Sequence, residues 1–186
     1  MKLILASNSP RRKQLLNSFG FDFEVVGSNY QENASDLTPQ EMVKTFALGK
    51  AKDVFDSLKG QDVLVLGADT VVSLDDKILG KPKDKQQAIE MLKELSGKTH
   101  QVWTGYAIIS KDGIYADAVK TDVVFNQLPI SLIVEYVATG KPLDKAGAYG
   151  IQDGYELVKE YRGSYNNVVG LPIELFAEKL KNILKD

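Results

Sequence analysis

Short apolar runs alternate with amphipathic stretches from the first residues of the chain onward. Residues 2–7 form an apolar run of strand length. Ser9 then supplies an N-cap side chain and Pro10 the first helical position, so we predict a helix that ends at Gly20 and a strand over 23–26. The residues of this helix predicted to face inward are Leu15, Leu16 and Phe19.

A second helix is predicted by the T-P-Q-E sequence that begins at Thr38, which combines a capping box with proline in the first turn. This helix follows a polar, irregular segment over 27–37 and ends near 59–60. Its apolar positions recur at helical spacing, at Val43, Phe46, Ala47, Ala51 and Val54. One side of the predicted helix is therefore apolar along most of its length.

The most apolar run of the chain covers residues 63–74 and contains one charged residue, Asp69. Such a run predicts a buried central strand. A helix over 85–95 comes after it, and Asp84 with Gln87 can cap that helix.

Tight turns and alternating segments dominate the next part of the chain. A turn is predicted over 78–82. Residues 100–110 and 114–125 alternate between apolar and polar positions and predict a hairpin. A helix over 130–138 and a last strand over 155–161 follow.

Two further segments complete the pattern. Residues 144–152 are small and glycine-spaced, so their backbone can approach another group closely, which suits the wall of a site. Pro172 is predicted to begin a C-terminal helix whose apolar face carries Leu175, Phe176, Leu180, Ile183 and Leu184. Because strands and helices interleave throughout, we predict an α/β fold with a mixed sheet, in a single domain over 1–186.

Composition narrows the classes of function. The formal net charge of -2 argues against general nucleic-acid binding, and the lack of a basic stripe interleaved with aromatic residues argues against an RNA-binding module. No run approaches the ~18 apolar residues of a membrane span. The chain has no cysteine, and its N-terminal apolar stretch is too short for a secretory signal, so a cytoplasmic location is expected.

Several familiar catalytic motifs are missing or incomplete. Gly97-Lys98-Thr99 resembles the end of a phosphate-binding loop, but Leu92 stands where that loop requires glycine. Neither G-x-G-x-x-G nor G-x-S-x-G occurs. His100 is the one histidine, so a zinc site of histidine and cysteine cannot be assembled, and a lone histidine is more often structural.

Asp69 and the three cations at 11–13 have two interpretations each. Asp69 lies inside the most apolar strand, where its desolvation is costly unless a metal or a cation compensates; the alternative is a structural aspartate bonded to backbone amides. The three cations at 11–13 stand at the positive end of a helix dipole, which favours a negative ligand nearby; the alternative is that they are solvated. Lys81, taken alone, is an ordinary surface lysine.

Six short blocks stand in order along the chain. They are S-x-S-P-R-R from Ser7, G-A-D-T from Gly67, G-K-P from Gly80, L-S-G-x-T-H-x-V from Leu95, D-K-A-G-A-Y-G-I-Q from Asp144 and V-G-L-P from Val169. Together they resemble the Maf family of nucleoside triphosphate pyrophosphatases. The resemblance implies a fold like that of the inosine triphosphate pyrophosphatases, with a long mixed sheet, flanking helices, and two lobes around a cleft.

The resemblance also implies which residues form the site. The catalytic residues would be Asp69, Lys81, Lys50 and Arg12, and the substrate-binding residues would be Ser9, Arg11, Arg12, Thr70 and Gln152. Arg11, Thr70 and Gln152 match the specificity positions of the subgroup that prefers dTTP and UTP. The acidic residue of the loop after the first helix would be Glu32, with Gln31 where many relatives have a second acid.

The implied chemistry is hydrolysis of dTTP and UTP, and of modified pyrimidine nucleotides, to the monophosphate and pyrophosphate, a housecleaning activity. Asp69 and Glu32 would hold Mg²⁺ or Mn²⁺, because such hard ions prefer carboxylate and phosphate oxygens. The Ser9 hydroxyl, the first helical amides and Arg12 would bind phosphate. The alternative is a nucleotide-binding regulator of septum formation without turnover. Homodimer formation stays open.

Overall fold

The computed structural model describes residues 1–33, 36–75 and 77–185. The chain divides into two compact units, the first made of Met1–Asp69, Thr104–Val119 and Gly170–Asp186 and the second of Thr70–Trp103 and Lys120–Val169. This division agrees with the predicted two lobes, whereas the cleft between them and the single domain over 1–186 stay predictions. Residues 34–35 of the predicted irregular segment lie outside the described residues.

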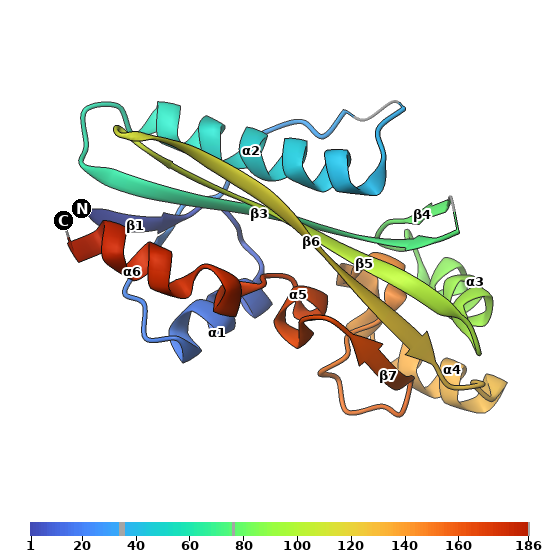
Figure 1. Cartoon of the computed structure of the whole chain (residues 1–186). Coiled ribbons are helices and arrows are strands. Elements are labelled where there is room, and N and C mark those ends of the chain that lie inside the picture. The colour runs from blue at the N-terminus through green and yellow to red at the C-terminus, as the bar shows by residue number, and fades with distance from the viewer. Residues whose placement is uncertain (34–35, 76, 186) are drawn as a thin grey trace. The chain divides into compact units, whose positions relative to one another are not determined.

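The described residues form one seven-stranded sheet in the order β2-β1-β3-β5-β6-β7, with β4 paired to β3 (Figure 1). Its strands are β1 (Lys2–Leu5), β2 (Glu24–Val25), β3 (Val63–Leu74), β4 (Lys77–Leu79), β5 (Thr99–Ser110), β6 (Gly113–Phe125) and β7 (Val158–Arg162). β1 runs parallel to β2 and β3, while β4 is antiparallel to β3 and β7 to β6. The predicted α/β class and the mixed sheet are confirmed.

In the first unit, helices cover both faces of the sheet. The helix α2 (Pro39–Ser57) lies on one face, and α1 (Pro10–Ser18) and α6 (Ala177–Lys185) lie on the other (Figure 1). Because side chains alternate along a strand, Val63 and Val65 of β3 pack under α2, whereas Leu64 and Leu66 join the cluster with α1 and α6. The strand is therefore apolar on both faces, as its sequence predicted.

The predicted helix starts in this unit are confirmed by their caps. The Ser9 side chain accepts a hydrogen bond from the Arg12 N–H at 3.5 Å. Thr38 and Glu41 form the full capping box, since each side chain accepts a hydrogen bond from the other residue's backbone N–H. These caps fix where α1 and α2 begin, and hence where their polar side chains lie.

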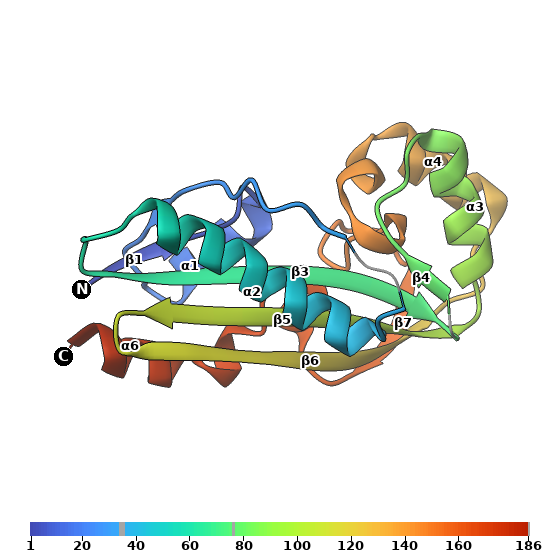
Figure 2. The same cartoon turned by 90° about the horizontal axis from the view of Figure 1, so that it is seen from above.

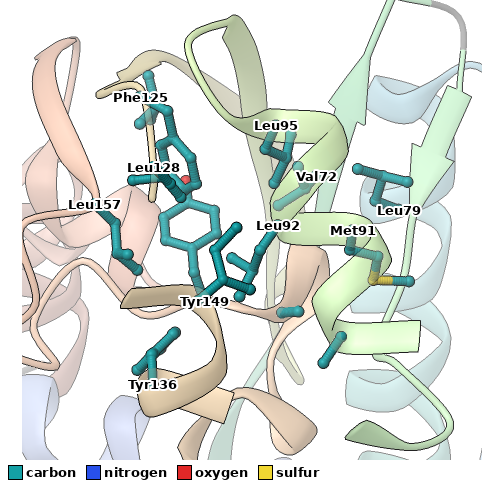
Figure 3. Packing of buried hydrophobic residues seen from close by; sticks show 14 of the residues in the cluster. Val72, Leu79, Met91, Leu92, Leu95, Phe125, Leu128, Tyr136, Tyr149 and Leu157 are labelled. Carbon is teal, nitrogen blue, oxygen red and sulfur yellow. The ribbon is translucent and has the colours of Figure 1, made fainter. Parts of the chain in front are cut away.

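In the second unit, α3 (Lys85–Leu95) and α4 (Ile130–Ala138) lie side by side (Figure 2). They enclose a core in which Tyr149 packs among leucines of α3 (Figure 3). Tyr149 also meets Phe125 edge to face, at 4.7 Å between ring centroids. Two short 3₁₀ helices, Lys141–Asp144 and Ala146–Ala148, carry the glycine-spaced segment into this core.

His100 belongs to this core. It is 1% exposed, and its Nε2 lies 2.7 Å from the Tyr149 hydroxyl. Burial lowers the pKa of His100 to about 4, because the charged form would be desolvated. The ring is therefore neutral at physiological pH, in keeping with a structural role.

Three predicted elements need correction, and one helix was not predicted. The expected turn over 78–82 begins with strand β4, because Leu79 pairs with Val72. The last strand is Val158–Arg162 instead of 155–161, and the helix that was not predicted is α5 (Tyr165–Val169). The chain does not become helical at Pro172, whose ψ is 58°; a 3₁₀ turn over Ile173–Leu175 precedes α6.

The prediction that Leu175 of this C-terminal segment is part of the core is also wrong. Leu175 is 59% exposed, because it lies in the 3₁₀ turn and not on the apolar face of α6. Phe176 and Leu180 are buried as predicted, while Ile183 and Leu184 pack against the same cluster and are partly buried.

Within 1–33, 36–75 and 77–185, none of the helices combines the length and apolar content that crossing a membrane requires.

Candidate active site

Lys50 holds two carboxylates together in the first unit. Its Nζ lies 2.6 Å from Asp69 Oδ1 and 2.6 Å from Glu32 Oε1. The side chains of Lys50 and Asp69 are 17% and 12% exposed, whereas that of Glu32 is 46% exposed. Asp69 is therefore desolvated and compensated by the Lys50 cation. Its functional role stays a prediction.

Two glycines let α2 lie close enough to the sheet for this contact. A Cβ on Gly67 of β3 would clash with the Ala47 carbonyl oxygen of α2, and a Cβ on Gly105 of β5 would clash with the Val43 carbonyl. Asp69 follows Gly67 by two residues, so both face α2. The close approach of helix and strand thus brings Lys50 to Asp69.

Arg12 is held beside this group by two hydrogen bonds. Its Nε donates to the Gly170 carbonyl at 2.8 Å and its Nη1 donates to Ser7 Oγ at 3.1 Å. These bonds use two of the five N–H groups of the guanidinium and fix its orientation. The sequence blocks contained Ser7 and Gly170, but nothing in their spacing assigned them the role of holding Arg12.

The charges of the site lie within electrostatic reach of one another. Burial lowers the pKa of the Arg12 guanidinium from its ordinary value, attraction by Asp69 and Glu32 opposes this shift, and repulsion from Arg11 adds to it. Arginine nevertheless stays charged in proteins. Two cations, Arg12 and Lys50, thus lie beside two carboxylates, Asp69 and Glu32, in a protein that is slightly acidic overall.

The first turn of α1 offers fewer amide donors than the sequence suggested. Pro10 has no N–H, and the Arg12 N–H is directed to Ser9 Oγ at 3.5 Å. That distance is long for a hydrogen bond, so a phosphate oxygen could compete with Ser9 for this donor. Arg12 and Lys50 therefore carry most of the positive charge that an anion would meet in the first unit.

Thr70, Lys81 and Gln152 belong to the second unit. Thr70 follows Asp69 on β3, while Lys81 and Gln152 are exposed and lie in loops. The loop of Lys81 is bonded to the 3₁₀ helix that precedes the Gln152 loop, since the Gly147 N–H donates to the Gly80 carbonyl at 3.1 Å. Their assembly with the residues of the first unit into one site stays a prediction.

The donor set suits a divalent cation that is shared with a substrate. Among the described residues no group of three acidic, histidine or cysteine side chains could hold a metal by itself. Asp69 and Glu32 nevertheless present two carboxylates to one point, where the Lys50 ammonium lies. Mg²⁺ is commonly bound by one or two carboxylates together with phosphate oxygens, so the two residues fit such an ion.

A nearly buried aspartate bonded to a lysine and within reach of an oriented arginine, on an α/β scaffold, marks a candidate active site and hence a class of α/β enzymes. The comparison with known families narrows this class. The family described as Maf-like protein matches residues 2–183, and the chain belongs to that family. The resemblance drawn from the six sequence blocks is thereby confirmed.

Named relatives match over nearly their full length. A dTTP/UTP pyrophosphatase of Thermococcus kodakarensis is 47% identical, covering 97% of this chain and 96% of that protein. A dTTP/UTP pyrophosphatase of Clostridium botulinum is 45% identical, covering 100% of this chain and 99% of that protein. One of Bacillus anthracis is 47% identical, covering 97% of this chain and 94% of that protein.

Two solved structures are similar to parts of the chain. A nucleoside-triphosphatase, or dITP/XTP pyrophosphatase, of Mycobacterium abscessus has a TM-score of 0.44 at 15% identity, covering 69% of this chain and 76% of that one. The Ham1 protein of Staphylococcus aureus has a TM-score of 0.46 at 13% identity, covering 68% and 73%.

Proposed function

We propose that the protein hydrolyses dTTP and UTP, together with modified pyrimidine triphosphates, to the nucleoside monophosphate and pyrophosphate. Membership of the Maf family and the activity for which relatives at 45–47% identity are named support this proposal. The structural observation that carries it is Asp69, nearly buried and bound to Lys50 within reach of Arg12. The names of the relatives favour turnover over the alternative, a regulator that only binds nucleotide.

Asp69 is proposed to activate the attacking water. Lys50 bonds to Oδ1, and no hydrogen bond to Oδ2 is found among the described residues. Oδ2 is then the atom that orients the water and takes its proton. The water oxygen bonds to the α-phosphorus, the bond from that phosphorus to the bridging oxygen breaks, and pyrophosphate leaves with the electron pair.

The cations are proposed to neutralise the charge that grows on the phosphates. Arg12 is oriented by Ser7 and Gly170 before any substrate binds, so little reorganisation is needed when the charge develops. Lys50 and, from the second unit, Lys81 add point charges. A divalent cation bound by Asp69 and Glu32 would supply further charge stabilisation on the phosphate oxygens.

Gln152 is proposed to recognise the base, with Arg11 and Thr70 as further specificity residues. Its carboxamide offers a donor and an acceptor, which complement a carbonyl and the N3–H of uracil or thymine. A purine that left this polar edge unpaired would lose about 1 to 3 kcal/mol of binding free energy. Nucleoside triphosphates are thus the proposed small-molecule partners.

Steady-state kinetics on the common ribonucleoside and deoxyribonucleoside triphosphates, with identification of the products, test the proposal. We expect dTTP and UTP well above the purines, with pyrophosphate as product. Release of orthophosphate, or the same rate on every base, would contradict it. The Gln152→Ala variant should lose activity mainly on pyrimidines; equal losses on purines would remove Gln152 from base recognition.

A further inference from the structure

Gln152 is presented by a four-residue turn. The Asp153 N–H donates to the Gly150 carbonyl at 3.1 Å, so Ile151 and Gln152 occupy its two central positions. Gln152 is exposed, whereas Gly150 is buried. The direction of the Gln152 side chain therefore depends on how the two ends of this turn are held.

One phenol holds both ends. The Tyr136 hydroxyl accepts a hydrogen bond from the Gly150 N–H at 2.9 Å and donates one to Asp153 Oδ2 at 2.6 Å. Tyr136 comes from α4 and is 0% exposed, with its ring in the core of the second unit (Figure 3). A rigid group in a packed core thus fixes the first and last residues of the turn that carries the exposed Gln152.

Lys145 forms an ion pair with Asp153, the last residue of the turn. Its Nζ lies 2.6 Å from the Lys141 carbonyl, 2.9 Å from Asp144 Oδ1 and 3.4 Å from Asp153 Oδ2. The side chains of Lys145 and Asp153 are each 10% exposed. A buried ion pair adds little net stability compared with apolar residues, so it is better explained by the geometry that it imposes on the turn.

The turn lies directly on this ion pair. A Cβ on Gly150 would come within 2.7 Å of Lys145 Cε and 2.8 Å of Asp153 Oδ2, so a larger residue there would displace the two side chains of the ion pair. A Cβ on Gly147, whose φ is +66°, would come within 2.9 Å of Val72. The glycine spacing noted in the sequence therefore lets this backbone approach the protein's own sheet and ion pair.

We propose that Tyr136, Asp153 and Lys145 are positioning residues that fix the Gly150–Asp153 turn, so that Gln152 meets a pyrimidine base in one orientation. This inference rests on the proposed function. The three residues govern base selectivity and the KM for UTP, and take no part in the chemistry at the α-phosphate. A misplaced carboxamide would form poorer hydrogen bonds with the base while the phosphate-binding cations stay as they are.

Tyr136→Phe is the sharpest variant, because it removes the hydroxyl and keeps the ring in the core. We expect the KM for UTP to rise about tenfold, with kcat changed less than about twofold and the rate on ATP unchanged. Tyr155→Phe is the matched control. Its ring lies 4.7 Å from that of Tyr136, and no hydrogen bond of its hydroxyl is found among the described residues.

A double-mutant cycle separates positioning from a general structural role. In a Gln152→Ala background, Tyr136→Phe should produce no further loss of selectivity between UTP and ATP, because both variants remove the same interaction. Additive effects, equal losses on UTP and ATP, or the same behaviour of Tyr155→Phe would overturn the inference. Hydrogen exchange of the Gly150 and Asp153 amides should quicken in Tyr136→Phe alone; unchanged exchange would also overturn it.

The substrate preference of the wild-type protein distinguishes failure of the proposed function from failure of the positioning inference. If it hydrolyses neither UTP nor dTTP, the proposed function fails, and the positioning of Gln152 for a pyrimidine fails with it. If it prefers pyrimidines and Tyr136→Phe retains that preference, the positioning inference alone fails.

Discussion

Two lysines of this chain are each held between a nearly buried carboxylate and a more exposed one. In the first unit the set is Lys50 with Asp69 and Glu32, whose side chains are 17%, 12% and 46% exposed. In the second unit the set is Lys145 with Asp153 and Asp144, whose side chains are 10%, 10% and 56% exposed. Burial and charge alone do not distinguish the two lysines.

The difference lies in how completely the polar atoms are satisfied. Lys145 has three acceptors for its three N–H groups, and the Asp153 oxygen that it faces also accepts the Tyr136 hydroxyl. Lys50 has two acceptors among the described residues, and Asp69 Oδ2 has no hydrogen bond there. A buried pair with filled hydrogen bonds fixes a structure, whereas one with capacity left over can bind a ligand.

The largest expected difference concerns stability. Lys145→Met would leave Asp153 nearly buried without its cation, so we expect the free energy of unfolding to fall by about 3 kcal/mol. Lys50→Met should cost about 1 kcal/mol, because Arg12 still attracts Asp69 and Glu32 is half exposed. Urea unfolding of both variants measures this. Equal losses would mean that the two lysines have the same structural role.

Activity should show the reverse order. Asp69→Asn is expected to keep the fold and lower kcat by about two orders of magnitude or more, as for the loss of a general base. Asp153→Asn should instead raise the KM for UTP more than it lowers kcat. Turnover of UTP under saturating conditions, with circular dichroism as the check on folding, decides between them. An unchanged rate for Asp69→Asn would remove it from the centre of the site.

Acid should weaken the second unit through His100. The pKa of His100 is lowered to about 4 in the folded protein, so the fold favours the neutral ring. The contribution of His100 to the free energy of unfolding is therefore fully present above the ordinary pKa of about 6.5. This contribution is lost as the pH falls from 6.5 towards 4, and the loss is about 2 kcal/mol at pH 5. Urea unfolding at pH 7.5 and pH 5 measures the loss. His100→Gln should lack this part of the pH dependence, and an identical dependence in both would contradict the assignment.

The smallest expected effect tests how the first unit orients its arginine. Arg12→Ala should raise the KM for UTP by about tenfold, and Arg12→Lys should recover little of it. A single ammonium cannot bond to Gly170 and Ser7 and also face a phosphate as the planar guanidinium can. Full activity with lysine would show that charge alone, without this geometry, is enough.

Elements with a strong local signal were predicted well from the sequence. The capping box at Thr38 and Glu41 fixes the start of α2, and the apolar run of β3 is found over the predicted residues. β4, β7 and α5 lack such a signal. The pairing of Lys77–Leu79 with β3 depends on register, and Tyr155 leaves the predicted strand to pack on Tyr136.

The site was predictable as a set of residues but not as an arrangement. Lys50 and Asp69 are 19 residues apart and meet because a helix packs on a strand, which no spacing rule contains. Their selection came from the resemblance to a family. Gly170 and Tyr136 form hydrogen bonds with residues distant in the sequence, which cannot be predicted before the fold is known. Ser7 is only five residues from Arg12, but their bond depends on how the chain turns into α1.

The two glycines beneath α2 have a consequence for how this chain can vary. Replacing glycine with alanine adds one methyl group, changes no charge and often raises stability by restricting the unfolded chain. At Gly67 or Gly105 the same methyl would push a whole helix away from the sheet and carry Lys50 away from Asp69. A substitution that is mild by every chemical measure would thus disable a site that it does not touch.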